Sequence, residues 1–240
     1  MSETTYRASI AAAMAIGPER FDTSGTTVCP ADDRRESNVV SHYRIGLHSV
    51  LWCDPALGAR VGRFDGADHG MTLADFDGWA TADGAELLGS GFDHALPDDW
   101  SEPPRPPAAE RLDTTDPSAV ERIRALLDAC TADERDDADF DVDALDPFLV
   151  GWRDRDRVLA LAGGRPWPPR PGHHDIGVIV HPEARGRGLG AAVVAALTSD
   201  IVDAGETPLY RCNQDNVGSW SLCRSVGYRS VAELTAHRWP

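Results

Sequence analysis

The stretch Arg185-Gly186-Arg187-Gly188-Leu189-Gly190 places three glycines between an apolar run at 176–180 and a long helical pattern. The N-terminus of a helix has unpaired backbone N–H groups and the positive end of the helix dipole, and both attract a phosphate group. Glycine permits positive φ angles and lets a ligand approach the backbone closely. The loop therefore predicts a site for a phosphorylated cofactor.

The residues around this loop predict alternating helices and strands. Two strands at 148–152 and 157–162 are joined by a charged turn, and a helix before them begins at Asp116-Pro117. After the loop, apolar residues spaced by four predict a helix that ends at Gly205. A strand at 209–212, a helix that ends at Gly227 and a strand between 228 and 239 follow. This order predicts an α/β (α+β) fold with a mixed, twisted sheet flanked by helices.

A proline-rich segment at 101–107 divides the chain, because four prolines in five positions can continue neither a helix nor a strand. We expect a smaller N-terminal α/β accessory domain at 1–100 and a second domain at 108–240. Within the first, 48–53 predicts a strand and Thr72 caps a helix. No motif in residues 1–100 indicates their role.

Composition excludes several classes of function. The net charge is −16 and the sequence contains no lysine, which disfavours nucleic-acid binding and excludes a P-loop lysine or a Schiff base. The histidines of the N-terminal part lack metal-ligand spacing, so we expect no metal. No apolar run is long enough for a membrane span, no secretory signal is recognisable, and the five cysteines suit reduced thiols. We expect a cytoplasmic protein, and a homodimer is compatible with the sequence.

The loop has two local interpretations, a dinucleotide-binding site and a tight turn that binds no ligand. Gly186-x-Gly188-x-x-Ala191 formally matches a dinucleotide fingerprint, which leaves a dinucleotide-binding oxidoreductase as an alternative. That fingerprint needs its first glycine directly after the strand, whereas residues 181–185 intervene here. A tight turn without a ligand is the other alternative, and it leaves Arg185 and Arg187 unexplained.

Arg185-x-x-Gly188-x-Gly190, preceded by Val180-His181-Pro182, resembles the acyl-CoA pyrophosphate loop of the GNAT superfamily of N-acetyltransferases. A second segment downstream falls at the spacing of another motif of that family; its residues are Asn216, Ser219, Leu222, Gly227 and Tyr228. The resemblance covers about residues 108–240. It implies a GNAT-like acyltransferase fold and acetyl-CoA as co-substrate.

In that family the strand before the loop separates from its neighbour, and acyl-CoA lies in the gap. The resemblance implies that backbone groups of Ile179 and Val180 bind the pantetheine arm and the thioester carbonyl. Asn216 would hold the pantetheine or cap its helix. The pyrophosphate would lie on the loop, whose residues are Arg185, Gly186, Arg187, Gly188, Leu189 and Gly190.

The implied reaction is direct attack of a primary amine on the thioester, which requires a base. Asp175 is the candidate base. The alternative is that Asp175 is only a solvated polar residue at the beginning of the strand. Glu183 is a weaker candidate base. Cys223 stands where the family commonly has the tyrosine that protonates the leaving thiolate. Three outcomes are open: Cys223 is the acid, another group such as Tyr228 replaces it, or the thiolate leaves unassisted. A thiol could also accept the acetyl group, and a packing residue is the alternative for Cys223.

The acceptor is a small-molecule amine or the N-terminal or side-chain amine of a protein. The acidic stretch at 133–141 lies where the family's acceptor-binding segment falls, and a solvated loop is the alternative there. A non-catalytic acyl-CoA-binding or regulatory protein of the same fold is the main rival to the enzyme, because of Cys223.

Overall fold

The computed structural model describes residues 3–68, 70–141, 143, 145–167 and 172–240. The chain divides into two compact units. We call residues 99–210 and 218–228 the central unit, and residues 3–98, 211–217 and 229–240 the terminal unit. Each unit is described by itself.

The central unit is built on a mixed sheet. Its strands are β5 (Ala109–Arg111), β6 (Phe148–Asp154), β7 (Arg157–Pro166), β8 (His173–Val180) and β9 (Thr207–Asn213), of which the last residues of β9 group with the terminal unit. Strands β5 to β8 pair antiparallel in the order β5-β6-β7-β8, and β9 joins β8 in parallel. The predicted hairpin and the predicted strand before the loop are therefore confirmed, and each strand is longer than expected.

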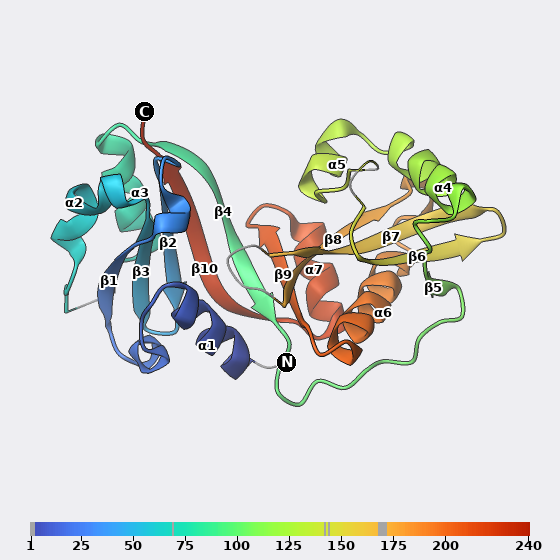
Figure 1. Ribbon diagram of the computed structural model, residues 1–240, viewed down its shortest axis with the longest axis horizontal. Coiled ribbons are helices and arrows are strands. Elements are labelled where there is room, and N and C mark those ends of the chain that lie inside the picture. The colour runs from blue at the N-terminus through green and yellow to red at the C-terminus, as the bar shows by residue number, and fades with distance from the viewer. Residues whose placement is uncertain (1–2, 69, 142, 144, 168–171) are drawn as a thin grey trace. The chain divides into compact units, whose positions relative to one another are not determined.

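Helices cover both faces of this sheet. The helices are α4 (Pro117–Asp128), α5 (Ala132–Asp137), α6 (Leu189–Asp203) and α7 (Val217–Val226). Helices α4 and α5 lie on one side of strands β6 to β8, and α6 lies on the other side (Figure 1). Side chains of α4, including the buried Ile123, Leu126 and Leu127, pack with Leu161 and Ile179 in one apolar cluster. Burial of this cluster holds α4 against β7 and β8.

The two helices before the hairpin begin at side-chain caps. The Asp116 carboxylate accepts from the Ser118 N–H at 2.9 Å, and Pro117 occupies the first helical position. Thr131 and Glu134 form a capping box at the start of α5. Residues 132–137 are therefore helical, although the sequence offered only an acidic segment or a solvated loop there.

The terminal unit has its own sheet, in the order β1-β3-β2-β10-β4. Its strands are β1 (Gly25–Pro30), β2 (Val39–Ile45), β3 (His48–Cys53), β4 (Glu86–Ala95) and β10 (Arg229–Arg238). Its helices are α1 (Glu3–Ala13), α2 (Gly58–Val61) and α3 (Leu73–Ala82), with short 3-10 turns η1 (Pro18–Asp22), η2 (Asp32–Arg34), η3 (Pro55–Leu57) and η4 (Gly62–Phe64). The predicted cap of α3 is present, since Thr72 Oγ1 accepts from the Asp75 N–H at 3.1 Å.

The last strand differs from the sequence-based division of the chain. Residues 108–240 were expected to form one domain, but β10 pairs antiparallel with β2 and with β4 of the terminal unit. A strand presents hydrogen-bonding groups on both edges, and nothing in its own sequence says which neighbours will satisfy them. The sequence of β10 therefore does not predict its neighbours, and the tertiary fold pairs it with β2 and β4.

Two buried histidines lie under α3 in the terminal unit. The rings of His42 on β2 and His237 on β10 contact Phe76, with centroids 5.2 and 5.5 Å from it. Among the described residues no group hydrogen-bonds their ring nitrogens. Burial lowers the pKa of His42 to about 3, with smaller contributions from the charges of Arg44 and His237. Burial also lowers the pKa of His237, against the Asp77 carboxylate 3.6 Å away.

We predict that acid destabilises the protein through His42. Below the unfolded-state pKa near 6.5, the unfolded chain binds a proton that the folded chain excludes until about pH 3, so stability decreases over this window. Relative to His42→Leu, the free energy of unfolding should fall by roughly 2 kcal/mol between about pH 7 and about pH 4.5. Urea unfolding of both proteins measures this difference, and parallel pH profiles would refute it.

Candidate functional site

Strand β8 separates from β9 partway along its length. Its register with β7 runs from His174 to Val180, but it pairs with β9 only from His173 to Asp175. Within the described part of the chain, residues 176–180 therefore have a strand neighbour on the β7 side and none on the β9 side. Such an edge presents backbone groups that a ligand can bind as an added strand would.

The register determines which backbone groups face the open side. The N–H of His181 donates to the Leu159 carbonyl at 2.9 Å, and hydrogen-bonded pairs alternate along an antiparallel ladder. Ile179 is consequently bonded towards β7, whereas Val178 and Val180 point their N–H and C=O groups away from it. Of the two strand residues expected at the thioester, Val180 has the required direction. Val178 is the second such residue, and the sequence did not single it out.

The three glycines of the loop have two different roles. Gly186 and Gly188 have φ angles of +73° and +79°, and a Cβ atom on either would have open space around it. Gly188 is the N-cap of α6 and supplies no side chain to the first N–H groups of the helix. Gly190, in contrast, is needed for packing, because its Cβ would lie 2.7 Å from Leu222 Cδ1 and 3.2 Å from Val180 Cγ2. Gly186 and Gly188 thus leave the helix N-terminus accessible to an anion.

Arg185 connects the loop to its surroundings. Its Nε donates to the Val180 carbonyl at 3.2 Å, and its Nη1 lies 2.7 Å from Glu134 Oε1. The hydrogen bond from Arg185 is the main reason that the pKa of Glu134 is lowered. Arg187 is exposed in the same loop, and Glu183 is an exposed turn residue 3.5 Å from Arg157. Arg185 therefore joins the loop to α5, and Arg187 is the cation that faces solution.

The strand entry carries a group of polar side chains. Asp175 lies half-buried on β8, across the ladder from Arg165. The ring of His174 is fixed by the Gly164 carbonyl, 3.1 Å from Nδ1, and by Glu206 Oε2, 3.3 Å from Nε2. Asp175 thus stands at the point where β8 and β9 separate.

Cys223 and Tyr228 both lie in the core of the central unit. Cys223 on α7 is 0% exposed, and its Sγ donates to the Trp220 carbonyl at 3.2 Å. The Tyr228 hydroxyl pairs with Thr198 Oγ1 at 2.8 Å. Burial raises the pKa of Tyr228 well above its usual value, which makes its phenol a weaker acid. Asn216 precedes α7, in a segment that groups with the terminal unit, and its N–H donates to the Asn213 carbonyl.

Asp146 and a pair of glycines were missed by the sequence analysis. Gly163 and Gly177 lie opposite each other on β7 and β8, and the Asp146 carboxylate packs over Gly163. Asp146 is 9% exposed, and burial raises its pKa, although the Arg165 guanidinium lies 3.4 Å away. No local signal distinguishes Asp146 from the other acidic residues that precede β6, because its burial depends on the tertiary fold.

Three arrangements that other kinds of site use are absent from the described part of the chain. No group of three or more His, Cys, Asp or Glu side chains is arranged there to hold a metal ion. None of the helices described is both long and apolar enough to span a membrane. The antiparallel β6-β7-β8 arrangement also differs from the successive parallel βαβ units of a dinucleotide-binding fold.

Residues 150–239 match the model of the family described as FR47-like protein, which is related to the GNAT superfamily. Among solved structures, a GNAT-family acetyltransferase from Colwellia psychrerythraea is 14% identical over 88% of this chain and 80% of its own, with a TM-score of 0.52. A GNAT-family acetyltransferase from Novosphingobium aromaticivorans is 24% identical over 65% of this chain and 68% of its own, with a TM-score of 0.48. No curated protein matches the chain.

A GCN5-related N-acetyltransferase from Kribbella flavida is 18% identical over 81% of this chain and 68% of its own, with a TM-score of 0.49. The family match over residues 150–239 confirms the resemblance to the GNAT superfamily that was based on the loop and the second segment. The predicted fold, a mixed sheet flanked by helices, is also confirmed.

We predict that Gly177→Ala destabilises the protein by displacing α5 from the sheet. A Cβ at this position would overlap the Ala138 carbonyl oxygen, a backbone atom that cannot rotate away. Overpacking of this kind costs about 1–3 kcal/mol. Gly186→Ala is the control, since its Cβ meets open space and only its positive φ opposes the change. Urea unfolding should rank Gly177→Ala as the less stable variant, and the reverse order would contradict this account of β8.

Proposed function

We propose that this chain is an acetyl-CoA-dependent N-acetyltransferase that transfers the acetyl group to a primary amine. The observation that carries the proposal is the separation of β8 from β9 directly before a glycine loop at a helix N-terminus. An unpaired strand edge offers backbone groups to the pantetheine arm, and unpaired N–H groups at a helix N-terminus bind a pyrophosphate. The chain presents both in succession.

The residues that would hold acetyl-CoA follow from the backbone directions. The backbone groups of Val178 and the N–H of Val180 would pair with the pantetheine arm and the thioester carbonyl, since the Val180 carbonyl already accepts from Arg185. The N–H groups from Gly186 to Gly190 would bind the pyrophosphate, with Arg187 adding positive charge from the exposed side. A backbone N–H directed at the thioester oxygen stabilises the charge that develops there during attack.

The chemistry requires a neutral amine. Its nitrogen attacks the carbonyl carbon of the thioester, the C–S bond breaks, and the thiolate of CoA leaves. Asp175 would accept the proton that the amine loses, directly or through water, because it lies where β8 and β9 separate. The acceptor is a small-molecule amine or an amine of a protein. Thiol release from acetyl-CoA with a panel of such amines tests the activity, and release with none of them would refute it.

A non-catalytic acyl-CoA-binding protein is the second candidate, and Cys223 favours it. The position where the family commonly has an acidic tyrosine holds a thiol that is 0% exposed and donates to a helix carbonyl. Tyr228 is also withdrawn into the core. Such a protein would bind acetyl-CoA and release no thiol with any amine.

We predict that Gly188→Asp abolishes CoA binding. The carboxylate would stand at the first N–H groups of α6 and repel the pyrophosphate, and like charges in contact cost several kcal/mol. Affinity for CoA should fall by at least about a hundredfold in calorimetry. Gly84→Asp is the matched control: its φ is +88°, its Cβ also meets open space, and it lies in the terminal unit. Normal CoA binding by Gly188→Asp would show that the loop is not the pyrophosphate site.

We predict that Cys223→Ala keeps its turnover within about twofold of the wild type, because a buried packing residue contributes equally to ground state and transition state. Its free energy of unfolding should decrease by about 1 kcal/mol through the small cavity left behind. Thiol release and urea unfolding measure the two effects. A loss of turnover without a loss of CoA affinity would instead assign Cys223 to proton or acetyl transfer.

A further inference from the structure

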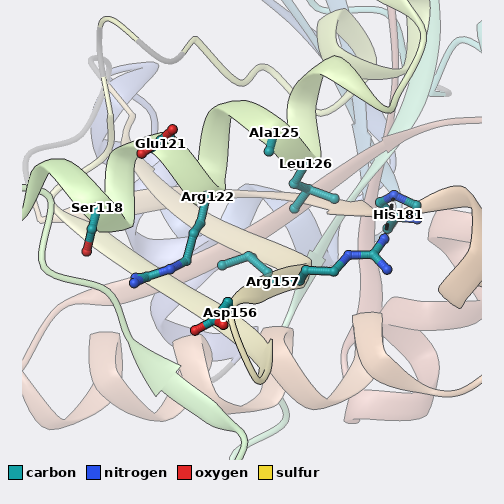
Figure 2. Close-up of a pocket in the computed structure, with 9 residues that line it drawn as sticks. Ser118, Glu121, Arg122, Ala125, Leu126, Asp156, Arg157 and His181 are labelled. Carbon is teal, nitrogen blue, oxygen red and sulfur yellow. Dashed lines mark hydrogen bonds between the residues drawn. The ribbon is translucent and has the colours of Figure 1, made fainter.

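A pocket separate from the candidate acetyl-CoA site lies in the central unit, between α4 and the beginning of β7. Its volume is about 530 Å³, within the range of small-molecule sites. None of the loop residues 185–190 lines it. The lining residues are Ser118, Glu121, Arg122, Ala125, Leu126, Asp156, Arg157, Val158 and His181. Figure 2 shows α4 above this pocket, with Arg122 extending towards the turn that carries Asp156 and with Arg157 extending towards His181.

The charges of the pocket are balanced around an apolar floor. Two guanidinium groups, of Arg122 and Arg157, are matched by two carboxylates, of Glu121 and Asp156. Leu126 and Val158 are buried apolar side chains at 1% and 3% exposure, and Ala125 adds a methyl group beside them. A ligand that carries both signs of charge and an apolar group matches this lining. A phosphate or another multiply charged anion would meet the two carboxylates.

Arg122 is the cation of this pocket that remains available. Among the described residues its guanidinium makes no hydrogen bond or close ion pair, although its charge helps to lower the pKa of Asp116, the N-cap of α4. Arg157 is partly engaged, since its Nη2 lies 3.1 Å from His181 Nε2 and 3.5 Å from Glu183 Oε2. A guanidinium group presents five N–H donors in a fork that fits a carboxylate. The guanidinium group of Arg122 can therefore bind the carboxylate of a ligand.

We propose that this pocket binds a free α-amino acid with an apolar side chain. Arg122 holds the carboxylate, the carboxylate of Asp156 receives the ammonium group, and the side chain lies on Leu126 and Val158. The proposal does not rest on the acetyltransferase function, because the pocket shares no residue with the loop. Binding to the free protein tests it without CoA.

The test is calorimetric titration of the full chain with leucine, 4-methylpentanoate and leucinamide. The second compound lacks the ammonium group and the third lacks the carboxylate. We expect saturable binding of leucine and at least about tenfold weaker binding of the other two, since a charge-assisted hydrogen bond is lost in each. Equal affinity for 4-methylpentanoate, or no binding of leucine, phenylalanine or methionine, would overturn the proposal.

Two variants assign the binding to this pocket. Arg122→Gln should weaken leucine binding by at least about tenfold, whereas Arg124→Gln, an exposed arginine on the same helix outside the pocket, should leave it unchanged. Asp156→Asn should weaken binding of leucine and not of 4-methylpentanoate. An unchanged affinity in Arg122→Gln, or an equal loss in Arg124→Gln, would place the binding elsewhere.

Discussion

The backbone groups of β8 must find hydrogen-bond partners on two sides, and the protein supplies them fully on only one. Strand β7 pairs with β8 from His174 to Val180, while β9 stops pairing after Asp175. Every feature of the candidate site depends on this asymmetry. It opens an edge at Val178 and Val180, sets Asp175 at its beginning, and directs the chain from the open edge into the glycine loop.

Close packing behind β8 keeps this edge in place. Gly177 allows the Ala138 carbonyl to lie against the sheet, and Gly190 allows α6 to approach Val180. Arg185 then ties the loop to both Val180 and Glu134. Because these contacts already use Arg185, the loop reaches solution through Arg187 and the N–H groups of the helix. Arg185 therefore fixes the position of the loop, and Arg187 supplies the positive charge that is exposed to solvent.

Much of the central unit could be predicted from sequence because its signals are local. The cap at Asp116, the spacing of apolar residues along α6 and the glycine that ends it each act within a few residues. The helix α5 was missed because acidic residues fill it, although its capping box at Thr131 was a readable signal. Asp146 had no such signal, since its carboxylate is buried over Gly163 of β7, which follows it by 17 residues in the sequence.

By itself the sequence determined the glycine loop, the strand and helix on either side of it, and hence the resemblance to the GNAT superfamily. Backbone dihedral preferences and helix-end chemistry act over short distances, so they can be read from consecutive residues. Only the tertiary structure decided that β8 leaves β9 after Asp175 and that β10 pairs with β2 and β4. It also decided that Cys223 is sealed in the core. Strand pairing and burial are contacts between residues far apart in sequence, and the open edge of β8 exists only once those contacts have formed.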